Sequence, residues 1–166
     1  IGYLPEDRQK EGLILDWGLG QNVTLSTLEK FTKFTVINRK AERERSKELL
    51  EKVKTKALSV FDKASSLSGG NQQKVIVAKV LNSDLKVVIL DEPTKGVDVG
   101  AKAQIYEIMS ELAAQGFGVI MISSEMPEVL GMADTILVMK EGRVSKIFAD
   151  ATGVTQEQIL EAAMNM

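Results

Sequence analysis

The sequence contains no cysteine and no histidine among its 166 residues. These absences exclude a disulfide framework, thiolate or imidazole metal sites, and catalytic triads built on Ser-His or Cys-His. Any chemistry must therefore rest on carboxylates, hydroxyls, lysine, arginine and backbone groups. The chain also lacks a long apolar run, because its longest ones, Val75 to Leu81 and Val119 to Ile122, fall far short of the roughly 20 residues of a membrane-spanning helix. We expect no membrane-spanning segment.

Neither sign of charge dominates the sequence. It has 21 Lys and Arg against 23 Asp and Glu, mixed along the chain, and a formal net charge of −2. A protein whose main partner is nucleic acid presents a basic surface, so this balance disfavours nucleic acid as a partner without excluding it. The hydrophobic fraction of 44% predicts one soluble globular domain with a buried core and excludes a disordered chain.

The first residues suggest a piece of a longer protein. Ile1 opens directly into an apolar run, with neither an initiator methionine nor a cleavable apolar segment before it. The run 1–4 predicts a strand that leaves the core into a polar loop at 6–11.

Hydrophobic periodicity predicts an α/β order of elements. Continuous apolar runs at 87–90 and 119–122 predict strands buried on both faces of a parallel sheet. Helical spacing predicts helices over 41–57, from the loop 65–70 to 81, and over 101–115. Strand, helix and strand within some thirty-five residues form a right-handed crossover unit, so the two strands are expected to be parallel.

Local signals refine three of these elements. In the helix 41–57, acids and bases alternate from Glu42 to Glu48, which predicts a solvent-exposed face, with the apolar stripe ending at Ala57. Lys140 to Gly142 predicts a three-residue hairpin loop between strands 136–139 and 144–148. Thr155 and Gln158 form a capping box for a short final helix.

A serine and two glycines, Ser68, Gly69 and Gly70, precede the apolar helix. Glycines let a phosphate approach the backbone closely, and the N–H groups and dipole at a helix start favour negative charge. An ordinary helix cap produces the same pattern, so this segment alone leaves both interpretations open.

Two carboxylates, Asp91 and Glu92, follow the apolar strand 87–90. The carboxyl ends of strands in open α/β sheets are where ligands bind. This order is typical of a Walker B motif, in which Asp91 would hold Mg²⁺ through its water shell and Glu92 would orient the attacking water. Carboxylates that cap the next turn are the alternative interpretation.

Taken together, the segment 67–74, the helix after it, Asp91 to Thr94 and Asp98 resemble the second half of an ATP-binding cassette, the nucleotide-binding domain of ABC transporters. The resemblance covers nearly the whole chain and implies an α/β, partial P-loop NTPase fold with a parallel-sheet core and a helical subdomain. It also implies residues that contact ATP held by the opposite cassette: Ser68, Gly69, Gly70 and Gln72 in the signature loop and Asp98 in the D-loop. Asp98 can equally cap the helix that begins near Ala101.

Segments 71–74, 96–102 and 123–132 look like the carboxy-terminal cassette of bacterial importers of ribose, galactose and xylose. This resemblance implies ATP-driven sugar import by a peripheral subunit at the cytoplasmic face of the inner membrane, with ATP and Mg²⁺ as cofactors. The implied partners are a second cassette, permease subunits and, indirectly, a sugar-binding protein. The implied parts are a Q-loop-like segment 1–21, a helical subdomain 22–82 that contacts the permease, a three-layer Walker B, D-loop and switch core 83–150, and a helical tail 151–166.

The sequence departs from the family pattern at three places. No Gly-x-x-x-x-Gly-Lys-Ser/Thr motif occurs, so the usual phosphate cradle is missing from these residues. Glu6 stands where most cassettes have the glutamine that senses Mg²⁺, and Ser124 stands where they have the switch histidine near the γ-phosphate. Ser124 is read more simply as a cap for the helix entered through Pro127.

These departures leave alternatives open. The cassette either hydrolyses ATP itself or is a non-hydrolytic cassette that completes its partner's ATP site and docks the permease. Glu6 and Ser124 favour the second interpretation. A cassette ATPase of translation or chromosome maintenance is a third possibility, but those proteins tend to keep a histidine or to carry long heptads, and neither occurs here.

Overall fold

The computed structural model describes residues 1–164, which form two compact units. The first unit is Ile1–Ile122 and the second begins at Ser123. The division falls inside the segment 83–150 that the sequence suggests as one core. In the part of the chain that is described, no helix is long and apolar enough to span a bilayer.

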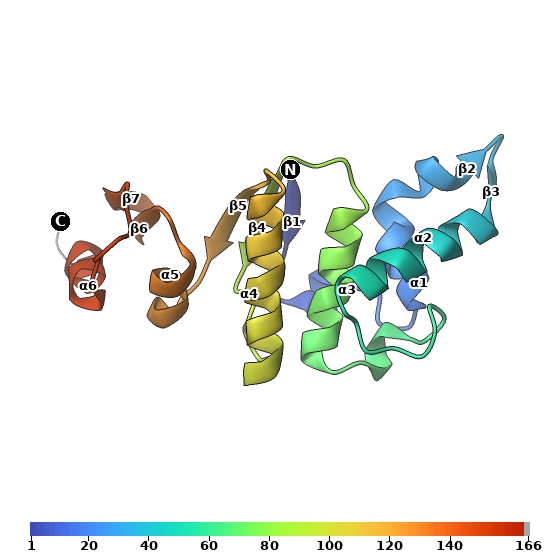
Figure 1. Cartoon of the computed structure of the whole chain (residues 1–166), viewed down its shortest axis with the longest axis horizontal. Helices are drawn as coiled ribbons and strands as arrows, with labels where there is room; N and C mark the ends of the chain where they lie inside the picture. Colours follow the sequence, from blue (N-terminus) through green and yellow to red (C-terminus); the bar gives the residue numbers. More distant parts are fainter. Residues whose placement is uncertain (165–166) are drawn as a thin grey trace. The chain divides into compact units, whose positions relative to one another are not determined.

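A parallel sheet organises the first unit (Figure 1). Its strands run in the order β1 (Gly2–Leu4), β4 (Val87–Asp91) and β5 (Gly118–Ile122). The helix α4 (Val99–Ala114) connects β4 to β5, and Gly116, at φ 85°, ends the connection as the sequence predicts. The expected parallel crossover is confirmed.

One face of this sheet is buried and the other is open. Leu4, Val88 and Leu90 are each 1% exposed, on the side where α3 (Gly69–Leu81) packs along β1 and contacts α4. On the opposite face, Tyr3 is 53% exposed and Ile120 is 50% exposed. The prediction of strands buried on both faces is therefore wrong within the first unit, whereas the three layers over 83–150 stay a prediction.

The helical part of the first unit packs on the far side of α3 (Figure 1). Its elements are α1 (Leu19–Thr24), the 3₁₀ helix η2 (Leu25–Phe31), the short strands β2 (Thr32–Lys33) and β3 (Val36–Ile37), α2 (Arg39–Lys52) and the 3₁₀ turn η3 (Ala64–Ser66). Because α3 contacts α1, α2, α4 and β1, its side chains are buried on nearly every side, as the sequence predicts.

Three local predictions in this unit are wrong. The polar segment 6–11 is not all loop, because the Asp7 carboxylate accepts backbone hydrogen bonds that start a π-helical turn, η1 (Arg8–Gly12). Helix α2 ends at Lys52 rather than at 57, since Lys54 adopts a left-handed φ of 53°, and Ala57 is exposed. Glu42 is buried, with 5% of its surface exposed.

The second unit is a hairpin covered by helices. It contains α5 (Met126–Met132), β6 (Ile136–Lys140), β7 (Arg143–Phe148) and α6 (Gln156–Met164). Its core includes Ile136, Val138, Ile159 and Ala162. The predicted capping box is present, because the Thr155 N–H donates to Gln158 Oε1 and the Gln158 N–H to Thr155 Oγ1.

The hairpin turn in this unit is one residue shorter than predicted. Lys140 pairs with Arg143, so the loop is Glu141 and Gly142 alone. Both have positive φ, 49° and 75°, and this is the geometry of a type I′ turn, whose twist matches that of the flanking strands.

Candidate functional site

Two adjacent carboxylates stand at the carboxyl end of the central strand. Asp91 is the last residue of β4, and its Oδ2 accepts a 2.8 Å hydrogen bond from the Tyr3 hydroxyl on the neighbouring strand. The Asp91 carboxylate accepts this hydrogen bond and thereby stabilises the protonated phenol, so the pKa of the Tyr3 phenol is raised. The Glu92 N–H donates to the Ile122 carbonyl at 2.9 Å.

The backbone of Glu92 is strained. Its φ of 46° lies in the left-handed region, which costs a non-glycine residue about 1–3 kcal/mol and is concentrated at functional sites. The left-handed conformation turns the chain sharply where the strand ends, and the buried residues Pro93 and Thr94 follow. We read this outlier as support for a functional role of Glu92.

The donors near Asp91 suit a cation that is shared with a ligand. Mg²⁺ in phosphate-binding sites is held by one or two carboxylates together with waters and phosphate oxygens. Within residues 1–164, no three Asp or Glu side chains converge on one point. Asp91 and Glu92 fit Mg²⁺ only as part of a set that a nucleotide completes.

Glu6, the other predicted metal contact, makes an ion pair with Lys95. The ion pair raises the pKa of the Lys95 ammonium because Glu6 accepts its hydrogen bond and stabilises its charge. Its carboxylate therefore contacts the loop that follows β4, and a role at the metal stays a prediction.

The signature segment forms the start of α3. Ser68 is the N-cap residue, at φ −63° and ψ 158°, and its Oγ accepts a 2.9 Å hydrogen bond from Asn71 Nδ2. The first N–H groups of a helix have no partner within it, so they are available to an anion. The side chain of Ser68 is exposed beside them.

Both signature glycines are also needed for packing inside the chain. A Cβ on Gly69 would lie 2.6 Å from Arg8 Nη2 and 3.2 Å from the Gly96 carbonyl oxygen. A Cβ on Gly70 would lie 2.5 Å from the Cβ of Ala101. Close approach of a phosphate is thus not the only reason for glycine at these two positions.

Gln72 is 3% exposed and its amide is used within the chain. Its Nε2 donates to the Ala64 carbonyl at 3.1 Å, and its Oε1 accepts from Gln9 Nε2 at 3.2 Å. The side chain joins η1 to the turn before the signature segment. Its predicted contact with nucleotide stays a prediction.

Asp98 caps α4, as one of the two interpretations predicts. Its Oδ1 accepts a 2.9 Å hydrogen bond from the Ala101 N–H. The residue is exposed, so capping leaves it accessible to a second cassette. Asp98 follows the turn at Gly96, whose φ is 67°.

Ser124 belongs to the second unit, and it does not cap α5. The helix begins at Met126, so its N-cap residue is Glu125. Ser123, not Ser124, accepts a hydrogen bond from the Glu125 N–H and donates to Glu128 Oε2, both at 3.0 Å. The predicted cap is wrong because the helix starts one residue later than a Ser124 cap requires.

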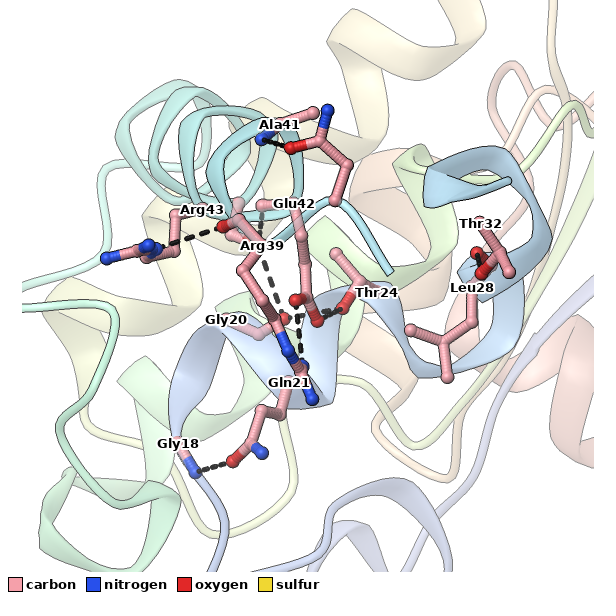
Figure 2. Close-up of polar contacts among 12 residues, drawn as sticks. Gly18, Gly20, Gln21, Thr24, Leu28, Thr32, Arg39, Ala41, Glu42 and Arg43 are labelled. Atoms are coloured by element: carbon pink, nitrogen blue, oxygen red, sulfur yellow. Dashed lines mark hydrogen bonds and ion pairs between the residues drawn. The ribbon is translucent and has the colours of Figure 1, made fainter. Parts of the chain in front are cut away.

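A groove opens in the helical part, between α1, α2 and the loop before η3. It encloses about 480 Å³ and is lined by Asp16, Gly18, Gly20, Gln21, Arg39, Glu42, Arg43, Ser46, Val60, Phe61 and Lys63. Figure 2 shows the Glu42 carboxylate between the two helices, where Thr24 Oγ1 donates to Oε1 and Arg39 Nη1 donates to Oε2, each at 3.0 Å. The groove thus has a fixed carboxylate at its bottom and basic side chains at its rim.

Three residues that no motif points to complete the site: Tyr3, Arg8 and Lys95. One of them had a usable signal, because the parallel register pairs Tyr3 with Ile89 and thereby places Tyr3 on the same face as Asp91. The contacts of Arg8 and Lys95 depend on loop conformation, which no periodicity encodes.

A parallel strand that ends in adjacent carboxylates, together with a helix that starts with glycines, is typical of α/β proteins that bind nucleotides. The fold is that of an ATP-binding cassette. It matches a dimeric structure of the ATP-binding cassette MJ0796 bound to ADP and Pi with a TM-score of 0.75 and 21% identity over 92% of this chain and 63% of that one. It matches the ATP-binding cassette MJ1267 with a TM-score of 0.77 and 21% identity over 99% and 69%.

Sequence comparison identifies the family. Residues 6–95 match the ABC transporter family, and the chain belongs to it. It is 49% identical to the xylose import ATP-binding protein XylG of Geobacillus kaustophilus, over 98% of this chain and 32% of that protein. It is 48% identical to the ribose import ATP-binding protein RbsA of Hahella chejuensis, over 98% and 32%. The chain spans about a third of the length of these relatives.

Proposed function

We propose that this chain is part of the ATP-hydrolysing subunit of an ABC importer for a monosaccharide, acting at the cytoplasmic face of the inner membrane. The observation that carries the proposal is the pair Asp91 and Glu92 at the carboxyl end of β4, with Glu92 in a strained conformation. The names of the relatives support sugar as the cargo. Their greater length supports placing the chain in a cassette of a longer, two-cassette protein.

Each site residue then has a definite role. Asp91 binds Mg²⁺ and Glu92 orients the attacking water at this cassette's own ATP, whereas Ser68, Gly69, Gly70 and Asp98 contact ATP held mainly by the opposite cassette. Hydrolysis separates the cassettes, and the permease responds. A separate sugar-binding protein delivers the sugar.

A second candidate function is a non-hydrolytic cassette that only completes the partner's ATP site. The ion pair between Glu6 and Lys95 favours it, because an acid bound to a lysine is a poor replacement for a neutral glutamine at a metal. Ser124 favours it too, because a serine hydroxyl cannot act as a cationic sensor of phosphate.

The groove between α1 and α2 is our proposed docking site for the permease. Phe61 is 68% exposed at its edge, and the Arg43 guanidinium lies 5.8 Å from the centre of that ring. An exposed apolar side chain beside basic side chains suits a short helix that carries an aromatic or aliphatic anchor and an acidic end.

Reconstitution tests both proposals. The full-length protein is assembled with its permease in lipid vesicles, and ATP hydrolysis is measured with and without sugar-loaded binding protein. We expect stimulation by a monosaccharide. Arg43→Glu is expected to weaken assembly with the permease about tenfold or more, while Lys40→Glu, an exposed change on the same helix outside the groove, is expected to assemble normally. No stimulation by any monosaccharide would contradict sugar import, and equal assembly of both variants would contradict docking in the groove.

These 166 residues alone are expected to bind ATP poorly. They lack the backbone nest and lysine that hold the β- and γ-phosphates, and contacts to Mg²⁺ from Asp91 are weak by themselves. Titration of ATP and Mg²⁺ into the isolated chain, followed by calorimetry, should give no binding in the micromolar range. A micromolar dissociation constant would refute this expectation.

A further inference from the structure

Arg8 connects the turn η1 to two other segments of the site, the turn at 95–96 and the start of α3. It opens η1, just after β1, and its Nη1 donates a 2.8 Å hydrogen bond to the Lys95 carbonyl. Its Nη2 donates to the Gly96 carbonyl at 3.4 Å. The same nitrogen fills the space that a Cβ on Gly69 would need, 2.6 Å away. The guanidinium therefore packs between the turn that precedes Asp98 and the start of α3.

The neighbours of Arg8 connect the same segments. Glu6 is ion-paired with the side chain of Lys95, and Gln9 Nε2 donates to Gln72 Oε1 in α3. Glu6, Arg8 and Gln9 thus make one ion pair and three side-chain hydrogen bonds to the turn at 95–96 and to α3, both distant in sequence. Among these three residues, Arg8 alone contacts both the turn at 95–96 and the signature segment at Gly69.

The guanidinium is kept there at a cost. Its Nε is buried and, among the described residues, has no hydrogen-bond partner. A buried donor that stays unpaired destabilises the folded state. This indicates that Arg8 is placed for its two carbonyl contacts rather than for maximal stability. A lysine could replace it only in part, because one ammonium lacks the fork that spans two adjacent carbonyls.

We propose that Arg8 is a positioning residue that holds the signature loop and the Asp98 loop in one fixed arrangement. Any displacement of segment 6–9 then moves both loops together, so that Ser68 and Asp98 reach the opposite cassette's ATP in register. The catalytic part of this inference rests on the proposed function, whereas the positioning part concerns this chain alone.

The test compares Arg8→Gln and Arg8→Lys with Lys10→Gln in the full-length protein. Lys10 is the matched control because it is an exposed cation in the same turn, and within residues 1–164 its ion pair is with Asp7 alone. Amide hydrogen exchange is measured without nucleotide, and kcat and KM for ATP hydrolysis are measured with the permease. Melting temperature checks that each variant is folded.

In Arg8→Gln, amides in 68–72 and 95–98 are expected to exchange about tenfold faster while the rest of the chain is unchanged. The kcat should fall about tenfold, with KM for ATP within twofold, and Arg8→Lys should restore part of it. Lys10→Gln should match the unaltered protein in every measurement. Unchanged exchange at both loops, or exchange that rises everywhere, would overturn the positioning role whatever happens to hydrolysis. Faster exchange confined to the loops in a protein that never hydrolyses ATP would support positioning and contradict the proposed function.

Discussion

Replacing Ser68 with aspartate is expected to lower steady-state ATP hydrolysis by the full-length protein about 10²-fold or more. Ser68 is the exposed N-cap of α3, where our proposal places the γ-phosphate of the opposite cassette's ATP. Aspartate is as good an N-cap as serine, and its charge is favourable at a helix start, so the fold should be retained or slightly stabilised. The added negative charge would instead repel the phosphate.

Ser68→Asn is the matched control, because asparagine has nearly the shape of aspartate, caps helices equally well and carries no charge. We expect it to lose far less activity than Ser68→Asp. Equal losses in the two variants would show that the size of the side chain, rather than its charge, causes the defect, and would contradict a phosphate at this position.

The same assay separates the two candidate functions. If this cassette's own ATP site does not hydrolyse ATP, Glu92→Gln should reduce total hydrolysis only a few-fold, whereas Ser68→Asp should abolish most of it. A severe loss in both variants would indicate that Glu92 is a working catalytic group and would contradict the non-hydrolytic interpretation.

Replacing Gly70 with alanine is expected to destabilise the first unit by about 2 kcal/mol. The new methyl group would lie 2.5 Å from the Cβ of Ala101, so α3 and α4 must move apart. The better helix propensity of alanine would offset part of the loss, by at most about 1 kcal/mol. Urea unfolding followed by the fluorescence of Trp17, the only tryptophan, measures the effect.

Gly118→Ala is the control for Gly70→Ala. A Cβ there would be 3.5 Å from its nearest neighbour, Val87 Cγ2, which is ordinary van der Waals contact, and we expect no loss of stability. A Gly70→Ala variant as stable as Gly118→Ala would show that α3 and α4 are less closely packed than the structure indicates. Because Gly70 affects the packing of the fold, its substitution is a poor probe of nucleotide contacts.

The sequence predicts the central elements well because their signals are local. The run 87–90, the spacing of Ile105 and Leu112, and the stop at Gly116 each depend on a few neighbouring residues, and all three are confirmed. The predicted burial of strand 119–122 failed for the opposite reason. Its residues are apolar, but β5 is an edge strand with an open face, and sheet order cannot be read from hydrophobicity.

Buried charge was the other source of error. Alternating acids and bases in α2 indicate a solvated face, yet Glu42 points at Thr24, whose hydroxyl donates to it. Nothing in the spacing of α2 shows that a hydroxyl lies opposite. The contacts of Arg8 could not be predicted for a related reason, since its partners are main-chain carbonyls and every residue type carries one.

The pairing of β1 with β4 has a consequence for how the chain is made. Leu4 pairs with Leu90, so the first strand emerges from the ribosome some 86 residues before its partner, a delay of about 4–17 s at ordinary rates of synthesis. The helices between them form contacts over shorter separations and can fold first, but β1 has no partner strand until β4 emerges, and its apolar residues are uncovered at least until α3 has been made. Closing so long a loop is also slow. We expect nascent chains halted between these strands to depend on chaperones that bind short apolar segments.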